Sequence, residues 1–341
     1  MTKFVFFLLI VQLFASIVSC QNEHVHVHLS NGPIVGETFD LGKSRFVHRF
    51  LGIPYAEPPV GELRFRKTRP LEHKWTEPLE AFKWPVKCMQ DVNHPWNANA
   101  GDNFEFNKNV SENCLFLNVW TPGIENEESK LRPVIVWIHG GALFMGTSST
   151  IIYDGKILAN MADAVVVTIN YRLSTMGFLY SDKVEGIKGN QGLWDQAMAL
   201  EWIQDNIRYF GGDANKVTII GESAGGWSVS ALVLSPVTRN LFHNAFIMSG
   251  AVDNRVIAKP ENLVKQFLIG IRKVGCATEH ETSISEEVMN CINKLKPEQI
   301  DQIFHLMYDD KFRKFLCFMK YLFFLCFSLF FFFSFPFSNG S

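Results

Sequence analysis

The stretch "VTIIGESAGGWSVSALVL", residues 217–234, decides the fold. Four β-favouring residues run into Gly-Glu-Ser-Ala-Gly-Gly, and an apolar segment rich in small residues follows. The motif at 221–225 fits G-x-S-x-G, a pattern in which a serine stands on a sharp turn from a strand into a helix. Glycines on both sides allow this turn without side-chain clashes. We therefore predict that Ser223 is a nucleophile raised above a sheet.

Strands and helices alternate along the chain after Pro133. Continuous apolar runs at 134–138 and 164–169 are typical of strands buried on both faces, and two further strands are predicted at 217–220 and 245–249. A helix of about 192–210 is predicted by apolar residues at helical spacing, and it ends at a Gly-Gly pair. These residues are Leu193, Ala197, Leu200, Ile203 and Ile207. The alternation predicts an α/β fold with a central, mostly parallel sheet, whereas 32–133 is expected to form loops and short antiparallel strands.

A second glycine-rich turn follows the first of these strands. The residues are His139-Gly140-Gly141-Ala142, and consecutive small residues let backbone N–H groups turn toward a substrate oxygen. The Ala224 N–H, at the start of the helix after Ser223, would point at the same developing oxyanion. A plain glycine turn is the alternative, and the serine turn downstream favours the oxyanion hole.

Composition limits the class of protein. The chain has 341 residues, a formal net charge of −2 and 47% hydrophobic residues. A near-neutral charge argues against a nucleic-acid partner and provides no attraction to anionic membranes.

The N-terminus has the pattern of a secretory signal peptide. Lys3 precedes an apolar run at 4–18, and two small residues then come before a polar segment. We expect residues 1–20 to be removed and the chain to be secreted. A buried helix and a retained membrane anchor are the alternatives, and the run is short for an anchor.

Secretion favours disulfide bonds. Of seven cysteines, one lies at the cleavage site and two lie in the C-terminal tail. Three pairings are open to the remaining four, and nearest-neighbour pairing would close two local loops. They are Cys88, Cys114, Cys276 and Cys291. None has zinc-site spacing, and Asn109 begins an Asn-Val-Ser sequon that predicts glycosylation.

Taken together, six stretches identify a family resemblance. They are "FLGIPYAEPPVGELRFR" (50–66), "ENCLFLNVW" (112–120), "VIVWIHGGALFMG" (134–146), "VVVTINYRL" (165–173), the segment 190–226 and "AFIMSG" (245–250). The chain resembles type-B carboxylesterases, the carboxylesterase–cholinesterase family of α/β-hydrolases, over about 32–295. The resemblance implies an α/β-hydrolase whose C-terminal part is missing.

The resemblance also assigns roles to residues. It makes Ser223 the nucleophile, and it places Glu222 in the active-site gorge. It forms the oxyanion hole from the N–H groups of Gly141, Ala142 and Ala224. The structural bonds that it implies are the disulfides Cys88–Cys114 and Cys276–Cys291 and the ion pairs Arg64–Glu112 and Arg172–Asp195.

Three positions depart from the family pattern, and one of them, Ala214 in place of a common proline, should matter little. Ala142 stands where many members have a third glycine, and its N–H is retained. Phe104 lies nearest to the place where cholinesterases carry a tryptophan, and Trp96 lies farther upstream. A general, insect-type or worm-type carboxylesterase therefore fits better than a choline-selective enzyme. No cofactor or metal is implied.

A base for Ser223 is not recognisable. In α/β-hydrolases the order is serine, acid, then histidine. The histidines after Ser223 are His243, His280 and His305, and none has a family context. We therefore expect this chain to lack the triad acid and histidine. Without the later strands the sheet would also end in an exposed hydrophobic edge.

The C-terminal tail suggests why the triad acid and histidine are missing. Residues 21–311 would form a partial carboxylesterase domain, and 312–341 are a Phe-rich hydrophobic tail. Translated intron sequence or a truncated gene model would give this composition. A membrane anchor or a glycolipid-anchor signal is the alternative.

The sequence thus predicts a secreted serine carboxylesterase that acts on small-molecule esters through an acyl-enzyme on Ser223 and is incomplete and inactive as it stands. The alternative is a non-catalytic, cholinesterase-like binding or adhesion protein. Membrane contact is expected only if the tail is a true anchor.

Overall fold

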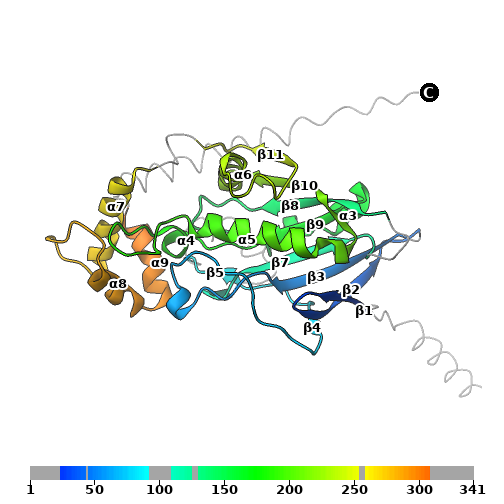
Figure 1. Cartoon of the computed structure of the whole chain (residues 1–341), viewed down its shortest axis with the longest axis horizontal. Coiled ribbons are helices and arrows are strands. Elements are labelled where there is room, and N and C mark those ends of the chain that lie inside the picture. Colours follow the sequence, from blue (N-terminus) through cyan, green and yellow to red (C-terminus); the bar gives the residue numbers. More distant parts are fainter. Residues whose placement is uncertain (1–23, 44, 92–108, 125–129, 253–257, 308–341) are drawn as a thin grey trace, which may run out of the picture.

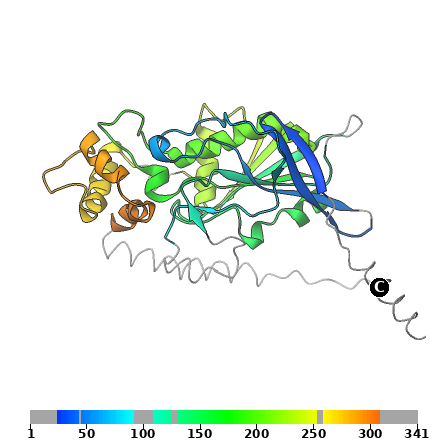
Figure 2. The same ribbon diagram turned by 90° about the horizontal axis from the view of Figure 1, so that it is seen from below.

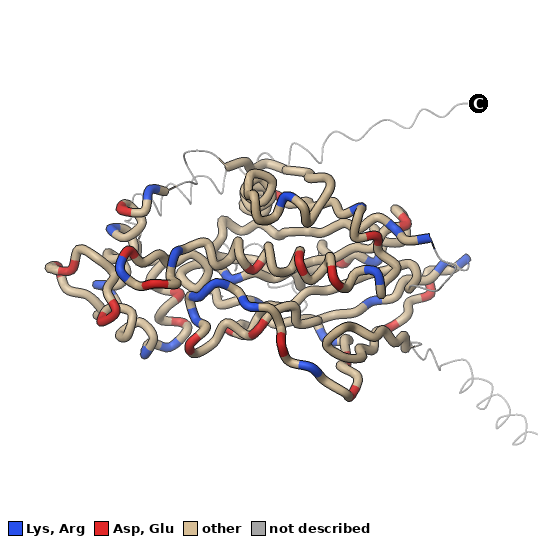
Figure 3. Tube along the Cα trace, in the orientation of Figure 1, with Lys and Arg blue, Asp and Glu red and all other residues tan. Residues whose placement is uncertain are grey.

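The computed structural model describes residues 24–43, 45–91, 109–124, 130–252 and 258–307. The predicted signal peptide, the Phe-rich tail and Phe104 lie outside these residues. Within the described part of the chain, no helix is both long and apolar enough to cross a bilayer. Basic and acidic positions are interspersed along the chain (Figure 3).

One large mixed sheet organises the molecule (Figure 1). Its parallel part has the order β9-β8-β10-β11, and its antiparallel part continues from β9 through β7, β3 and β2 to β1. The parallel strands are β8 (Arg132–Ile138), β9 (Val165–Ile169), β10 (Gly212–Glu222) and β11 (Asn244–Met248). The antiparallel strands are β1 (His24–Leu29), β2 (Gly32–Asp40), β3 (Phe46–Pro54) and β7 (Phe116–Thr121).

Three short strands complete the pairing. β4 (Leu79–Glu80) lies beside β2 in parallel, and β5 (Lys87–Cys88) pairs with β6 (Val110–Ser111) in a separate two-stranded sheet. The predicted strands after Pro133 are therefore confirmed, and antiparallel strands occupy the segment where they were expected.

Helices cover both faces of the sheet (Figures 1 and 2). The main core lies under α5 (Gln191–Asn206) and α6 (Ala224–Leu234). α3 (Lys156–Ala162) closes a smaller core on the other face, which contains Trp120 and Val166. The short 3₁₀ helices are η1 (Gly61–Leu63), η2 (Ile151–Tyr153) and η3 (Ile207–Phe210).

The predicted amphipathic helix is α5 with η3. Of its five predicted apolar positions, Ala197, Leu200, Ile203 and Ile207 are buried, and Leu193 is half-buried. The chain then turns at Gly211, whose φ of 74° favours glycine.

A second core lies at one end of the sheet. It joins α4 (Ser174–Phe178), α7 (Pro260–Lys273), α8 (Glu286–Asn293) and α9 (Pro297–Leu306). Figure 1 shows α7, α8 and α9 grouped at that end. The Cys276–Cys291 disulfide belongs to this group of helices.

The expected hydrophobic edge is present in the described structure. β11 is the last strand on its side of the described sheet, and none of its residues is buried. Phe246 is 58% exposed and Ile247 is 41% exposed. Parallel strands are normally covered on both faces, and the described residues do not provide that cover for β11.

Candidate active site

Ser223 lies on the sharp turn between β10 and α6. Its φ of 56° and ψ of −121° are strained for a residue with a side chain. A Cβ atom on Gly221 would lie 2.3 Å from the Gly225 carbonyl oxygen, and one on Gly225 would lie 2.1 Å from the Ile138 oxygen. Both positions therefore require glycine. The Ser223 N–H donates to the Met248 carbonyl oxygen at 2.9 Å, which ties the turn to β11.

The loop after β8 lies against this turn. A Cβ on Gly140 would be 3.3 Å from the Ser223 Cβ and 2.7 Å from the Glu222 carbonyl oxygen. Gly141 and Ala142 have φ values of 104° and 52°. Within the described chain, neither of their N–H groups donates a hydrogen bond to another residue. The loop therefore holds two unused donors close to Ser223.

A third donor comes from α6. Ala224 is the first residue of this helix, so its N–H has no partner within the helix and lies at the positive end of the helix dipole. The structure thus brings together Ser223 and the segments that carry the three predicted oxyanion donors.

His139 and Gln90 hold the loop after β8, residues 139–146, in place; this loop is called the glycine loop below. The buried His139 ring stacks on Tyr171 at a centroid distance of 4.4 Å, and its Nδ1 lies 2.8 Å from the Gly140 carbonyl oxygen. Gln90 Nε2 donates to the Cys88 and Gly146 carbonyl oxygens at 3.0 and 2.9 Å, and its Oε1 accepts from the Gly146 N–H at 3.0 Å. This role of Gln90 was not predicted, because a lone glutamine carries no motif.

Burial shifts the pKa of groups near the serine. Desolvation lowers the pKa of His139 to about 4, against the smaller opposing effect of its Gly140 hydrogen bond. Burial also raises the pKa of Glu222 above its ordinary value. The pKa of Tyr153 rises to about 12, chiefly through burial and also through the Glu222 charge. Glu222, which precedes Ser223 in the chain, is therefore in a partly desolvated position.

The histidines after Ser223 lie elsewhere. His243 is exposed and accepts a 3.4 Å hydrogen bond from the Val217 N–H, and His280 is exposed before α8. His305 lies on α9, where its Nε2 is 3.4 Å from Asp301 Oδ2 and its ring is 5.5 Å from Phe144. Among the described residues, no histidine hydrogen-bonds to the Ser223 hydroxyl.

The structural bonds implied by the resemblance are present. The disulfides Cys88–Cys114 and Cys276–Cys291 span 26 and 15 residues. Arg64 binds both carboxylate oxygens of Glu112 at 2.5 and 2.7 Å. Arg172 binds both carboxylate oxygens of Asp195 at 2.8 Å. Asn109 is exposed just before β6, and its glycosylation stays a prediction.

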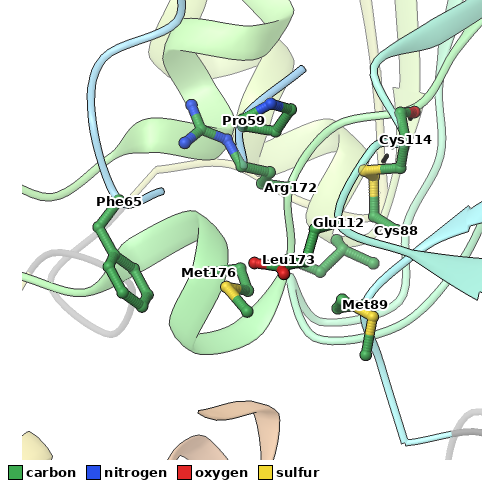
Figure 4. A pocket seen from close by; sticks show the side chains of 9 residues that line it. All are labelled: Pro59, Phe65, Cys88, Met89, Glu112, Cys114, Arg172, Leu173 and Met176. Carbon is green, nitrogen blue, oxygen red and sulfur yellow. Dashed lines mark hydrogen bonds between the residues drawn. A yellow bond between two sulfur atoms is a disulfide. The ribbon is translucent and has the colours of Figure 1, made fainter. Parts of the chain in front are cut away.

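A small cavity lies next to the first disulfide (Figure 4). Its volume of about 10 Å³ holds about one water molecule, and its lining includes Glu112 and Arg172. None of its lining residues belongs to the serine turn or to the glycine loop. It therefore lies beside the structural ion pairs and apart from the serine turn.

A mixed sheet with a serine on a strained strand-to-helix turn, facing a loop of free N–H groups, defines an α/β-hydrolase. The chain belongs to the carboxylesterase family, whose model matches residues 23–321. It is 42% identical to acetylcholinesterase-1 of Trittame loki over 280 residues. The matched region is 80% of this chain and 48% of that protein. It is 40% identical to liver carboxylesterase 1F of Rattus norvegicus over 285 residues, which are 82% of this chain and 49% of that protein. The chain thus spans about half the length of these relatives.

Proposed function

We propose that this chain is the nucleophile-bearing part of a secreted serine carboxylesterase. One observation carries the proposal: Ser223 occupies a strained turn that places it against a glycine loop with unused N–H groups. A purely structural turn has no need of such strain, and strain of this kind gathers at functional sites.

The reaction is an acyl transfer to Ser223. Its Oγ forms a bond to the ester carbonyl carbon, and the carbonyl oxygen becomes an oxyanion that accepts from the N–H groups of Gly141, Ala142 and Ala224. When the tetrahedral intermediate collapses, the bond to the alkoxy oxygen breaks and an acyl-enzyme remains. Water then attacks the acyl carbon and releases the acid and Ser223.

A base must accept the Ser223 proton and deliver it to the leaving alcohol. No described histidine is hydrogen-bonded to Ser223, and the chain spans about half of its relatives. We therefore propose that the histidine and its acid partner belong to sequence outside this chain, so that this chain alone is inactive. A non-catalytic, cholinesterase-like binding protein is the second candidate, and the same observation favours it.

The substrate we propose is a small carboxylic ester without choline selectivity. The relatives' names include both acetylcholinesterases and carboxylesterases, so kinship alone does not separate the two. The proposal rests on Phe104, which stands near the cholinesterase tryptophan position and lies outside the described residues. The test compares the rates at which the protein, extended to include its missing C-terminal part, hydrolyses acetylcholine and naphthyl acetate. Faster hydrolysis of acetylcholine would contradict it.

The first experiment is to sequence the 3′ end of the transcript beyond the codon for residue 311. We expect it to continue into family-like sequence with an acidic residue and then a histidine. The extended protein should react with a fluorophosphonate probe at Ser223, and its Ser223→Ala variant should not. If the mature transcript encodes the Phe-rich tail and the secreted product does not react, the binding protein is the better assignment. Hydrolysis that survives Ser223→Ala would refute the site.

A further inference from the structure

The outward face of β1 consists entirely of imidazoles. His24, His26 and His28 are exposed, and they alternate with Val25, Val27 and Leu29, which are buried in the main core. β1 is the edge strand of the described sheet and forms six consecutive residue pairs with β2. The ladder and the buried face therefore hold the three histidines in a row on one surface.

Strand geometry determines which of these histidines can act together. Alternate residues of a strand lie about 6.7 Å apart, and histidine nitrogens bind metals at about 2.0–2.1 Å. Two imidazoles at this separation can turn toward one ion between them. His24 and His28, about 13 Å apart, are too distant to share one. His26 is therefore the member common to both usable pairs.

The neighbours leave the imidazole nitrogens available. His26 and His28 lie opposite Val35 and Pro33 on β2, so no charged side chain faces them across the ladder. None of the three imidazoles hydrogen-bonds to another described residue.

His24 has a different environment from the other two. It lies opposite Glu37, whose carboxylate binds Arg49 at 2.6 Å. Its ring also packs 5.0 Å from the Phe82 ring. These contacts make the His26–His28 pair the less hindered of the two.

We propose that the exposed face of β1 binds a divalent first-row transition metal through two histidines, one of which is always His26. Imidazole nitrogen suits Cu²⁺, Ni²⁺ and Zn²⁺, and Cu²⁺ binds most tightly in this series. In the described residues, no group of three His, Cys, Asp or Glu side chains could hold a metal. The site is therefore an open chelate completed by water, and serine ester hydrolysis makes no use of it.

The test is a calorimetric titration of the secreted chain with CuCl₂ and with ZnCl₂ at pH 7.4. The protein must carry no polyhistidine tag. The variant is His26→Thr, because threonine favours strands and offers no metal-binding nitrogen. Since linked ligands bind roughly 10²-fold or more tighter than separate ones, we expect His26→Thr to weaken the Cu²⁺ affinity by at least about 10-fold. The matched control is His280→Thr, an exposed histidine outside β1, which should leave the affinity unchanged.

The flanking variants sharpen the result. His24→Thr and His28→Thr each leave one pair intact, so each should weaken binding much less than His26→Thr does. Equal effects of all three β1 variants, or none from His26→Thr, would overturn the proposal. If His26→Thr lost its native circular dichroism, His26→Gln would replace it in the same comparison.

Discussion

Two buried regions of this molecule achieve rigidity in opposite ways. Around Ser223, backbone packs directly on backbone, several residues take strained conformations, and two N–H groups of the glycine loop have no partner in the described chain. Around Arg172 and Asp195, by contrast, charged groups are almost fully bonded. The first arrangement leaves capacity for a ligand, and the second leaves none. The reactivity that we propose for Ser223 therefore depends on donors that the fold holds in place but does not use.

The Arg172–Asp195 cluster ties three parts of the chain together. Asp195 on α5 accepts from the Arg172 N–H and guanidinium and from the Thr68 hydroxyl. Arg172 also donates to the Arg66 carbonyl oxygen at 2.9 Å. The cluster thus joins the segment after β9, the loop after η1 and α5.

The largest predicted effect breaks this cluster. Asp195→Ala would leave the buried Arg172 guanidinium without its carboxylate partner, because both side chains are at most 4% exposed. Removing one member of a buried ion pair costs about 3–5 kcal/mol. We expect the free energy of unfolding, measured by urea titration, to fall by that amount.

Glu279→Ala is the control for the ion pair. Glu279 is 86% exposed and lies 3.7 Å from Arg272, and exposed pairs of this kind contribute about 0–1 kcal/mol. Equal losses of unfolding free energy in Asp195→Ala and Glu279→Ala would show that burial does not decide how much an ion pair contributes to stability.

The next prediction concerns backbone packing under the serine. Gly225→Ala would place a Cβ 2.1 Å from the Ile138 carbonyl oxygen and 3.0 Å from that of His139. Since backbone atoms cannot move aside as a side-chain end can, we expect a loss near the upper end of the usual overpacking range, about 3 kcal/mol. Gly42→Ala is the control, because nothing lies within 4 Å of its Cβ position and only its φ of 79° is unfavourable. That control should lose about 1–2 kcal/mol. A smaller loss for Gly225→Ala than for Gly42→Ala would contradict the packing argument.

Acid should loosen the serine region through His139. Its pKa falls from the ordinary value of 6.5 to about 4 in the folded state, so between these values the unfolded chain binds the proton and the folded chain does not. Stability is therefore lost as the pH falls from about 6.5 toward 4, by about 3 kcal/mol from this group. Urea titrations at pH 7 and pH 4.5 of the wild type and of His139→Gln should differ in slope with pH, the variant having the shallower one. Parallel slopes would mean that His139 is not kept neutral by burial.

Much of the fold, and of the turn that carries Ser223, could be predicted from the sequence. The apolar runs at 134–138, 164–169 and 245–249 and the glycines around Ser223 are local signals, and each became the predicted element. β10 is longer than predicted, beginning at Gly212 and not at Val217, because the polar residues before Val217 show no strand pattern. The role of Gln90 could not be predicted for a different reason: its hydrogen bonds to Gly146 join positions 56 residues apart, and such contacts leave no local pattern.

The smallest predicted effect has the opposite sign. Ser223 adopts φ 56° and ψ −121°, which costs a residue with a side chain about 1–3 kcal/mol. Ser223→Gly removes that strain, while glycine costs about 0.5–1 kcal/mol through the entropy of the unfolded chain. The relief of strain exceeds this entropic cost, so we expect Ser223→Gly to raise the free energy of unfolding by about 1 kcal/mol, measured by urea titration. Ser223→Ala keeps the Cβ and therefore the strain, and its stability should stay within about 0.5 kcal/mol of the wild type. If the glycine variant were less stable than the alanine variant, the turn would be relaxed, and the argument that strain holds Ser223 ready for chemistry would fail.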